Sequence, residues 1–196
     1  MRATRLVRPA DAPALADLLQ TNRDFLAPWE PARPDEYATE AGQSHEIKVL
    51  LELHEQGVAV PRVILDESGA LVGRITLFHI ERRAFQSANL GYWLGEAANG
   101  RGLATAAVGE MVRLAFDELG LHRVQAGTLL HNVRSQRVLE RNGFVRFGVA
   151  PRYLQIAGQW QDHALYQVLA PGRAGPAPSG NPYGFGAAPA EGAPAG

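Results

Sequence analysis

Segments with the hydrophobic pattern of strands alternate along the chain with segments patterned as helices, and this alternation restricts the fold more than any other feature. Strand-like segments lie at residues 4–8, 58–65, 71–78, 88–94, 123–129, 144–156 and 160–169. Helical segments, each apolar on one face, lie at residues 11–22, 35–56, 103–119 and 133–141. Turn residues at 66–69 and 157–158 make two pairs of consecutive strands antiparallel neighbours. The pattern predicts an α/β (α+β) domain with a mixed sheet.

The predicted domain ends near residue 170. The 196 residues suit one domain with a single core. From residue 171 to 196 the chain is almost entirely Gly, Pro, Ala and Ser, so this stretch cannot bury enough apolar area to offset its ordering entropy. We therefore expect a domain at residues 1–170 and a disordered tail at 171–196, where Tyr183 and Phe185 are the aromatic candidates for docking.

Composition excludes several classes of function. The 19 Lys and Arg residues nearly balance the 20 Asp and Glu residues, which argues against a surface for nucleic acid or anionic lipid. The absence of cysteine excludes disulfides, thiolate metal sites and an acyl-cysteine intermediate. His54 and Glu55 begin like H-E-x-x-H, but the second histidine is missing, so no metal is expected. With no apolar leader and no membrane-spanning run, a cytoplasmic protein is expected.

A glycine-rich turn, residues 99–105, precedes the helix predicted at 103–119. A helix start presents unpaired N–H groups and a partial positive charge, and glycine lets a ligand approach the backbone closely. The turn can therefore hold a diphosphate, with the Arg101 guanidinium available for a further phosphate. The natural N–H donors are those of Gly102, Leu103, Ala104 and Thr105. A dinucleotide fingerprint is excluded because Thr105 stands at its third glycine position, whereas an ordinary glycine-rich connection stays open.

A second motif, residues 132–144, has the pattern of a strand end, a short helix, a glycine stop and the next strand. Asn132 stands where a helix N-cap belongs, and Ser135 three residues later returns a hydrogen bond in a variant capping box. Gly143 ends the helix. Capping alone accounts for this segment, so by itself it does not establish a site.

Together the two motifs resemble the GNAT superfamily of N-acetyltransferases. The acetyl-CoA loop of that family follows a Q/R-x-x-G-x-G/A pattern, which Gly102 and Ala104 satisfy while Asn99 departs from it at the first position. Asn132 and Ser135 match the family's N-x-x-S. Residues 22–31, 90–94, 132–144 and 158–163 are similar to the RimJ/RimL branch, most of all to RimJ, and that branch acetylates N-terminal amines of ribosomal proteins. The resemblance covers about residues 4–170.

The resemblance implies a fold and a cofactor site. The fold is a mostly antiparallel seven-stranded sheet flanked by four helices, with a central splayed parallel pair formed by residues 88–94 and 123–129. Acetyl-CoA is expected between these two strands, where Asn132 contacts the pantetheine and Ser135 protonates the departing thiolate. A strand N–H at Trp93 or Leu94 is expected to stabilise the oxyanion. The implied cofactor contacts are Tyr92, Trp93, Leu94, Asn99, Arg101, Gly102, Leu103, Ala104, Thr105, Asn132 and Arg137.

The resemblance also implies an acceptor, the N-terminus of a protein, with a ribosomal protein as the partner of a monomeric or homodimeric enzyme. Phe25, Trp29 and Glu30 are expected to wall its groove, and Glu30 is expected to grip the amine. The predicted catalytic residues are Ser135, Asn132 and Glu30. An α-amine has a pKa of about 7.7 to 8.0, so it can attack the thioester directly without a strong base.

The candidate bases are His79, Glu30 and Glu96. Two other functions fit the same residues. The first is acetylation of a small-molecule amine, and the second is a non-catalytic CoA-binding or interaction domain.

Overall fold

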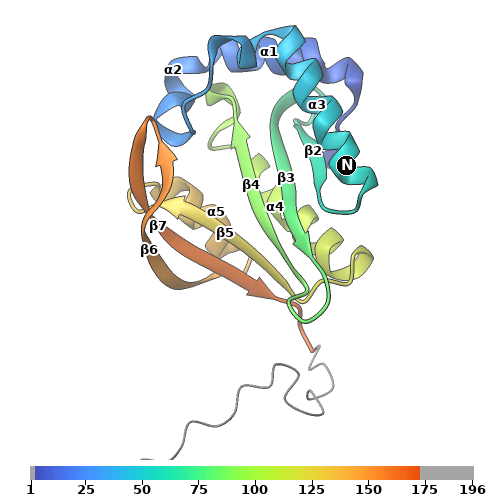
Figure 1. Ribbon diagram of the computed structural model, residues 1–196, viewed down its shortest axis with the longest axis vertical. Helices are drawn as coiled ribbons and strands as arrows, with labels where there is room; N and C mark the ends of the chain where they lie inside the picture. Colours follow the sequence, from blue (N-terminus) through green and yellow to red (C-terminus); the bar gives the residue numbers. More distant parts are fainter. Residues whose placement is uncertain (1–2, 173–196) are drawn as a thin grey trace, which may run out of the picture.

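A seven-stranded sheet with the order β1-β2-β3-β4-β5-β7-β6 forms the centre of the protein (Figure 1), for which a computed structural model describes residues 3–172. The strands are β1 (Thr4–Leu6), β2 (Val60–Leu65), β3 (Leu71–Glu81), β4 (Ser87–Leu94), β5 (Arg123–Leu129), β6 (Val145–Ile156) and β7 (Gln159–Leu169). The helices are α1 (Ala12–Thr21), α2 (Arg23–Leu26), α3 (Glu40–Glu55), α4 (Leu103–Arg113) and α5 (Val133–Arg141). The mixed seven-stranded sheet flanked by helices confirms the predicted fold class.

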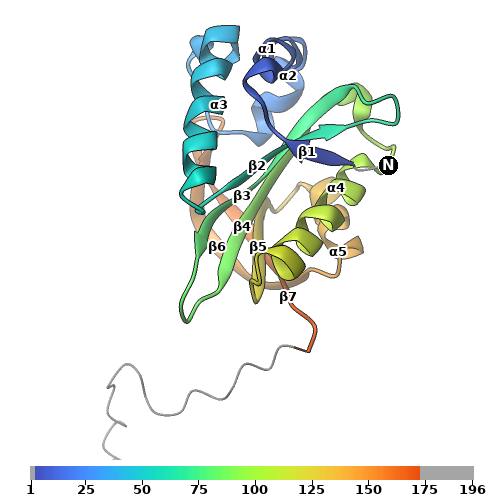
Figure 2. The same ribbon diagram turned by 90° about the vertical axis from the view of Figure 1, so that its right-hand side faces the viewer.

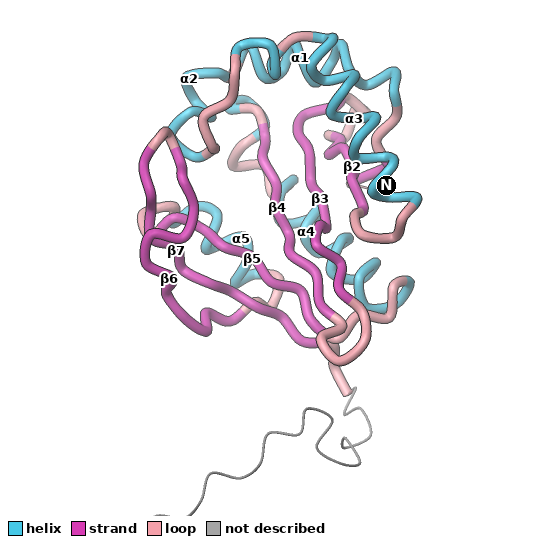
Figure 3. The backbone as a smooth tube through the Cα atoms, in the orientation of Figure 1, coloured by secondary structure: helices cyan, strands magenta, loops and turns pink. Residues whose placement is uncertain are grey.

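The parallel strands β4 and β5 separate along their length. They pair only from Ser87 opposite Arg123 to Asn89 opposite Gln125. Beyond this point β4 continues its ladder with β3, and β5 continues its ladder with β7. Figure 3 shows the two strands meeting at one end and diverging toward the other. The sheet is thus two halves joined at one end, which confirms the predicted splayed pair.

The two faces of the sheet carry different layers. Figure 2 shows α4 and α5 on one face and α1 and α3 on the other. Adjacent residues of β2 serve both layers, because successive side chains of a strand point to opposite faces. Ile64 belongs to the core beneath α4, whereas Val63 packs with Leu15 and Ile47 beneath α1 and α3. The same seven-stranded sheet therefore holds two separate apolar clusters.

Two predicted helices have different bounds in the structure. The helix predicted at residues 35–56 is interrupted at Thr39, whose extended backbone and Oγ1, accepting from the Gly42 N–H at 3.1 Å, cap α3. A short 3-10 helix, Asp35–Ala38, precedes it and lies so close that a Cβ at Gly42 would stand 2.1 Å from the Glu36 carbonyl oxygen. The helix predicted at residues 103–119 is α-helical to Arg113 and continues as a π-helical turn, Leu114–Glu118.

The remaining elements agree closely with the sequence pattern. β5 and α5 have the predicted bounds. Four short elements were not predicted: α2 and the 3-10 turns Pro9–Asp11, Ala27–Trp29 and Glu96–Ala98. No helix among residues 3–172 is long and apolar enough to cross a membrane. Apart from Pro171 and Gly172, the predicted tail lies outside the described residues.

Candidate active site

A cavity lies where β4 and β5 separate, and we call it the gap cavity. Its walls include Gly91 to Trp93 from β4, Ala126 to Leu129 from β5, and Asn132 and Ser135 at the start of α5. The predicted residues Trp29 and Glu30 close the same cavity from the other side. The separation of the strands therefore brings the predicted catalytic residues Ser135, Asn132 and Glu30 around one space.

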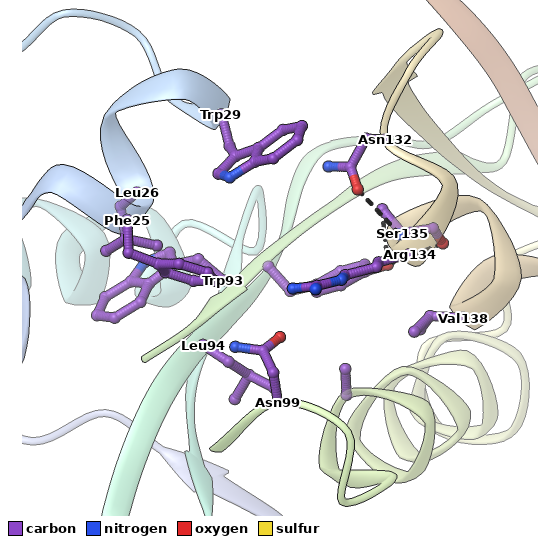
Figure 4. A pocket seen from close by; sticks show the side chains of 12 residues that line it. Phe25, Leu26, Trp29, Trp93, Leu94, Asn99, Asn132, Arg134, Ser135 and Val138 are labelled. Atoms are coloured by element: carbon purple, nitrogen blue, oxygen red, sulfur yellow. Dashed lines mark hydrogen bonds between the residues drawn. The ribbon is translucent and has the colours of Figure 1, made fainter. Parts of the chain in front are cut away.

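Ser135 is held by two neighbours. Asn132 caps α5, because its Oδ1 accepts the N–H of Ser135 at 3.1 Å, as Figure 4 shows. The Tyr92 hydroxyl lies 2.8 Å from Ser135 Oγ, a contact in which either oxygen can be the donor, and 3.3 Å from the Ser135 carbonyl oxygen. Burial raises the pKa of Tyr92 to about 12, against the lowering effect of its hydrogen bond to Ser135. Tyr92 is therefore neutral near pH 7. Asn132 both caps α5 and lines the gap cavity.

The glycine-rich turn borders a second and larger space of about 600 Å³, which we call the glycine-turn cavity. Gly100 and Gly102 have φ of +77° and +80°, and a Cβ built on either would meet no atom within 4 Å. No side chain among the described residues caps the start of α4. The first N–H groups of that helix therefore face an open space without a partner, as a diphosphate site requires.

Two predicted residues of this turn have local partners. Asn99 lines the glycine-turn cavity, and its Nδ2 donates to the carbonyl oxygens of Gly95 at 2.9 Å and Glu96 at 3.2 Å. Arg101 forms ion pairs with Glu67 and, at 3.8 Å, with Asp66, both from the β2–β3 turn. Its side chain is not among those that line the cavity. A phosphate contact by Arg101 would therefore require these ion pairs to break.

Three arginines of α5 line the glycine-turn cavity instead: Arg134, Arg137 and Arg141. Sequence reasoning named Arg137 and missed the other two. Their spacing of three and four residues was the available signal, because such residues share one face of a helix.

A third space, the central cavity, joins the first two. It shares Tyr92, Asn132 and Ser135 with the gap cavity, and Ala104 and Arg134 with the glycine-turn cavity. Phe25 and Trp29 close it from the N-terminal segment, and Figure 4 shows Trp29 across the cavity from Asn132. The shared walls place the three cavities next to one another, in a path of adjoining cavities from the glycine-rich turn to Glu30.

Glu30 lies at the far end of this path. Its backbone carbonyl accepts the Ala157 N–H at 3.0 Å, so the β6–β7 hairpin lies against this segment. Burial raises the pKa of the Glu30 carboxyl, while the charges of Arg74 and Arg33 oppose that rise. The carboxylate therefore costs free energy in the folded protein unless a cation joins it.

The other candidate bases lie elsewhere. His79 is exposed and near Asn89, with 3.5 Å between His79 Nδ1 and Asn89 Nδ2, and it does not line the gap cavity. Glu96 lines the glycine-turn cavity. The buried His163, which is not one of the predicted site residues, does line the gap cavity, and its Nδ1 lies 3.0 Å from the Gln161 carbonyl oxygen.

Comparison with known proteins places this geometry in context. Residues 4–145 match the model of the Acetyltransferase (GNAT) domain. A Bacillus subtilis protein named "Probable N-acetyltransferase YjcK" is 40% identical over 172 residues, which are 86% of this chain and 95% of that protein. The Escherichia coli [ribosomal protein uS5]-alanine N-acetyltransferase is 35% identical over 85% of this chain and 87% of its own length.

A solved structure, Mycobacterium smegmatis RimJ in complex with CoA-disulfide, superposes with a TM-score of 0.82 and 31% identity. The match covers 85% of this chain and 81% of that one.

Proposed function

The chain belongs to the GNAT acetyltransferase family, and on this premise we propose that it transfers the acetyl group of acetyl-CoA to the N-terminal α-amine of a protein, with a ribosomal protein as the acceptor. The observation that carries the proposal is the path of adjoining cavities from the glycine-rich turn to Glu30 through the gap between β4 and β5. The named activity of the Escherichia coli relative supports the acceptor class. A ribosomal acceptor also implies a cytoplasmic enzyme.

The donor side of the path is suited to coenzyme A. In this proposal the N–H groups of Gly102 to Thr105 bind the diphosphate with Asn99 beside it, and Arg137 lines the same cavity. The open space in front of Gly100 and Gly102 supports this fit. The backbone of Tyr92 to Leu94 and the Asn132 side chain then line the pantetheine arm.

Strand alternation selects the oxyanion donor. The Gly95 N–H donates to Val72 beside β3, and alternate N–H groups of a strand point the same way. The N–H of Trp93 therefore points to β3, whereas that of Leu94 points into the gap between β4 and β5. Of the two predicted donors we assign Leu94 to the oxyanion, because a fixed N–H aimed at developing charge stabilises the transition state.

Ser135 supplies the proton to the departing thiolate in this proposal. A serine hydroxyl has one hydrogen, so it can reach sulfur only if that hydrogen is not used elsewhere. We assign the one hydroxyl hydrogen of Tyr92, which is neutral near pH 7, to Ser135 Oγ at 2.8 Å, and this assignment leaves the serine hydrogen free. The role of Tyr92 in this proposal is to position Ser135 through their 2.8 Å contact, and the proton that the attacking amine loses replaces the one that Ser135 gives to the sulfur.

Replacing Glu30 with glutamine is expected to raise the KM for the peptide acceptor about tenfold and to leave the KM for acetyl-CoA unchanged, because a charge-assisted contact to the ammonium is lost. Glu36→Gln, which changes an exposed carboxylate of the same segment, is the matched control. Equal peptide KM values in the two variants would remove Glu30 from the acceptor site.

The same substitution has an expected effect on stability. The pKa of Glu30 is raised in the folded protein, so its ionisation opposes folding above the ordinary carboxyl pKa and is without effect below it. Glu30→Gln is therefore expected to stabilise the protein at pH 7 relative to wild type and to have little effect at pH 4. Urea unfolding at the two pH values measures this difference, and a larger gain at pH 4 would contradict the assigned direction.

A panel of acceptors tests the proposed function. Acetyl-CoA consumption is measured with peptides that begin with Ala, Ser, Thr or Met, beside polyamines, amino acids and aminoglycosides. We expect turnover with peptides that begin with Ala or Ser and none with peptides whose α-amine is blocked. Turnover with a small amine alone would replace the proposal by the small-molecule alternative, and binding of acetyl-CoA without any turnover would favour the non-catalytic one.

A further inference from the structure

The three arginines of α5 that line the glycine-turn cavity have no partners of opposite charge. Among residues 3–172 none of Arg134, Arg137 and Arg141 forms an ion pair or a side-chain hydrogen bond, and all three are exposed. Glu96 is the one acidic side chain in the lining of this cavity. The cavity wall thus carries an excess of positive charge.

This arrangement weakens the helix that carries it. Like charges three and four residues apart repel one another across a helix face. Arg134 also lies in the first turn of α5, where the helix dipole disfavours a cation. The dipole favours Arg141, which lies in the last turn, but no carboxylate among residues 3–172 pairs with any of the three arginines, so they are suited to an anionic ligand.

The direction of α5 determines which of the three arginines lies nearest to Ser135 and which lies nearest to the start of α4. The N-terminal end of α5 holds Ser135 against Tyr92. At its C-terminal end Asn142 Nδ2 donates to the Thr105 carbonyl oxygen at 3.1 Å, in the first turn of α4. A helix rises 1.5 Å per residue, so Arg141 lies about 9 Å along the axis from Ser135. Arg134 is thus nearest the acetyl end of the path, and Arg141 is farthest from it.

The positive groups exceed the needs of a diphosphate. The backbone N–H groups at the start of α4 already form an anion site, and Arg134 also borders the central cavity. Coenzyme A carries one more phosphate, on the 3′ oxygen of its ribose, beyond the diphosphate as seen from the thioester. We propose that Arg141, with Arg137 one turn before it, forms a subsite for this 3′-phosphate and lets the enzyme select coenzyme A over dephospho-CoA. This inference rests on the proposed use of acetyl-CoA.

Titration calorimetry with CoA and dephospho-CoA tests the subsite without any acceptor or turnover. Wild type is expected to bind CoA at least about tenfold more tightly than dephospho-CoA, because a charge-assisted arginine contact to phosphate contributes that much. In Arg141→Ala the affinity for CoA should fall about tenfold while that for dephospho-CoA stays within about twofold, so that the preference nearly disappears. Arg137→Ala should lower the preference as well.

Arg83→Ala, in the β3–β4 turn and outside the cavity lining, removes the same charge at another place and should keep the wild-type preference. A wild-type preference near one, or equal losses for both ligands in Arg141→Ala, would overturn the 3′-phosphate subsite while leaving the proposed function intact. Failure of wild type to bind either ligand would overturn both. Unchanged thermal unfolding of Arg141→Ala shows that the loss is local.

Discussion

Alanine at position 135 is expected to lower kcat about a hundredfold, since a positioned general acid contributes at least that factor. The KM for acetyl-CoA should change little, because the Ser135 hydroxyl acts on the departing sulfur rather than on the bound donor. Steady-state kinetics with saturating peptide measure both constants. Ser44→Ala, an exposed serine of α3, is the matched control and should retain full activity. A Ser135→Ala enzyme with wild-type kcat would exclude Ser135 as the proton donor.

The same experiment distinguishes two roles for Tyr92. If Tyr92 acts through Ser135, Tyr92→Phe lowers kcat about tenfold in the wild-type background and adds nothing to Ser135→Ala. The basis is the 2.8 Å contact between the Tyr92 hydroxyl and Ser135 Oγ. Multiplying effects in the double variant would instead show that Tyr92 acts independently of Ser135.

Glutamate at position 102 is expected to weaken acetyl-CoA binding by at least about a hundredfold. Its carboxylate would occupy the open space in front of the α4 N–H groups and repel the diphosphate, and two like charges about 4 Å apart near a protein surface interact by about 4 kcal/mol. Titration calorimetry measures the loss. Undiminished affinity in Gly102→Glu would place the diphosphate elsewhere.

Two control variants separate charge from backbone strain. Gly102 has φ +80°, where any side chain is strained, so Gly102→Ala reports the strain without the charge. Gly57→Glu places the same carboxylate at another positive-φ glycine, φ +73°, in open space after α3. We expect both control variants to lose some stability and to keep most of their affinity for acetyl-CoA.

The sequence predicted best those elements whose limits are set by neighbouring residues. The Asn132 cap and the Gly143 stop determine α5, and both are readable in the chain itself. The start of α3 was misplaced because residues 35–38 carry a helical pattern. The interruption at Thr39 depends on the close approach of Gly42 to the Glu36 carbonyl oxygen, which hydrophobic periodicity does not reveal.

In the site, too, features set by neighbouring residues were predicted, whereas contacts between distant residues were not. The glycine-rich turn and the Asn132–Ser135 pair were predicted, because helix starts have recognisable residues. The partners of Arg101 were not, because Glu67 lies 34 residues earlier and only the tertiary fold brings them together. The same holds for the contact between Tyr92 and Ser135, 43 residues apart. Arg141 was also missed, although its spacing of four residues from Arg137 was visible in the sequence.

The short ladder between β4 and β5 leaves backbone hydrogen-bonding groups of both strands without a strand partner. Only three residue pairs join the two halves of the sheet, and beyond them each strand presents an unpaired backbone edge to the other. The pantetheine arm carries amide groups of its own, which can pair with such edges as a strand would. If acetyl-CoA pairs with both edges, it bridges the two halves of the sheet and stabilises the folded protein. The concentration of acetyl-CoA in the cell then affects the stability of the enzyme as well as its rate.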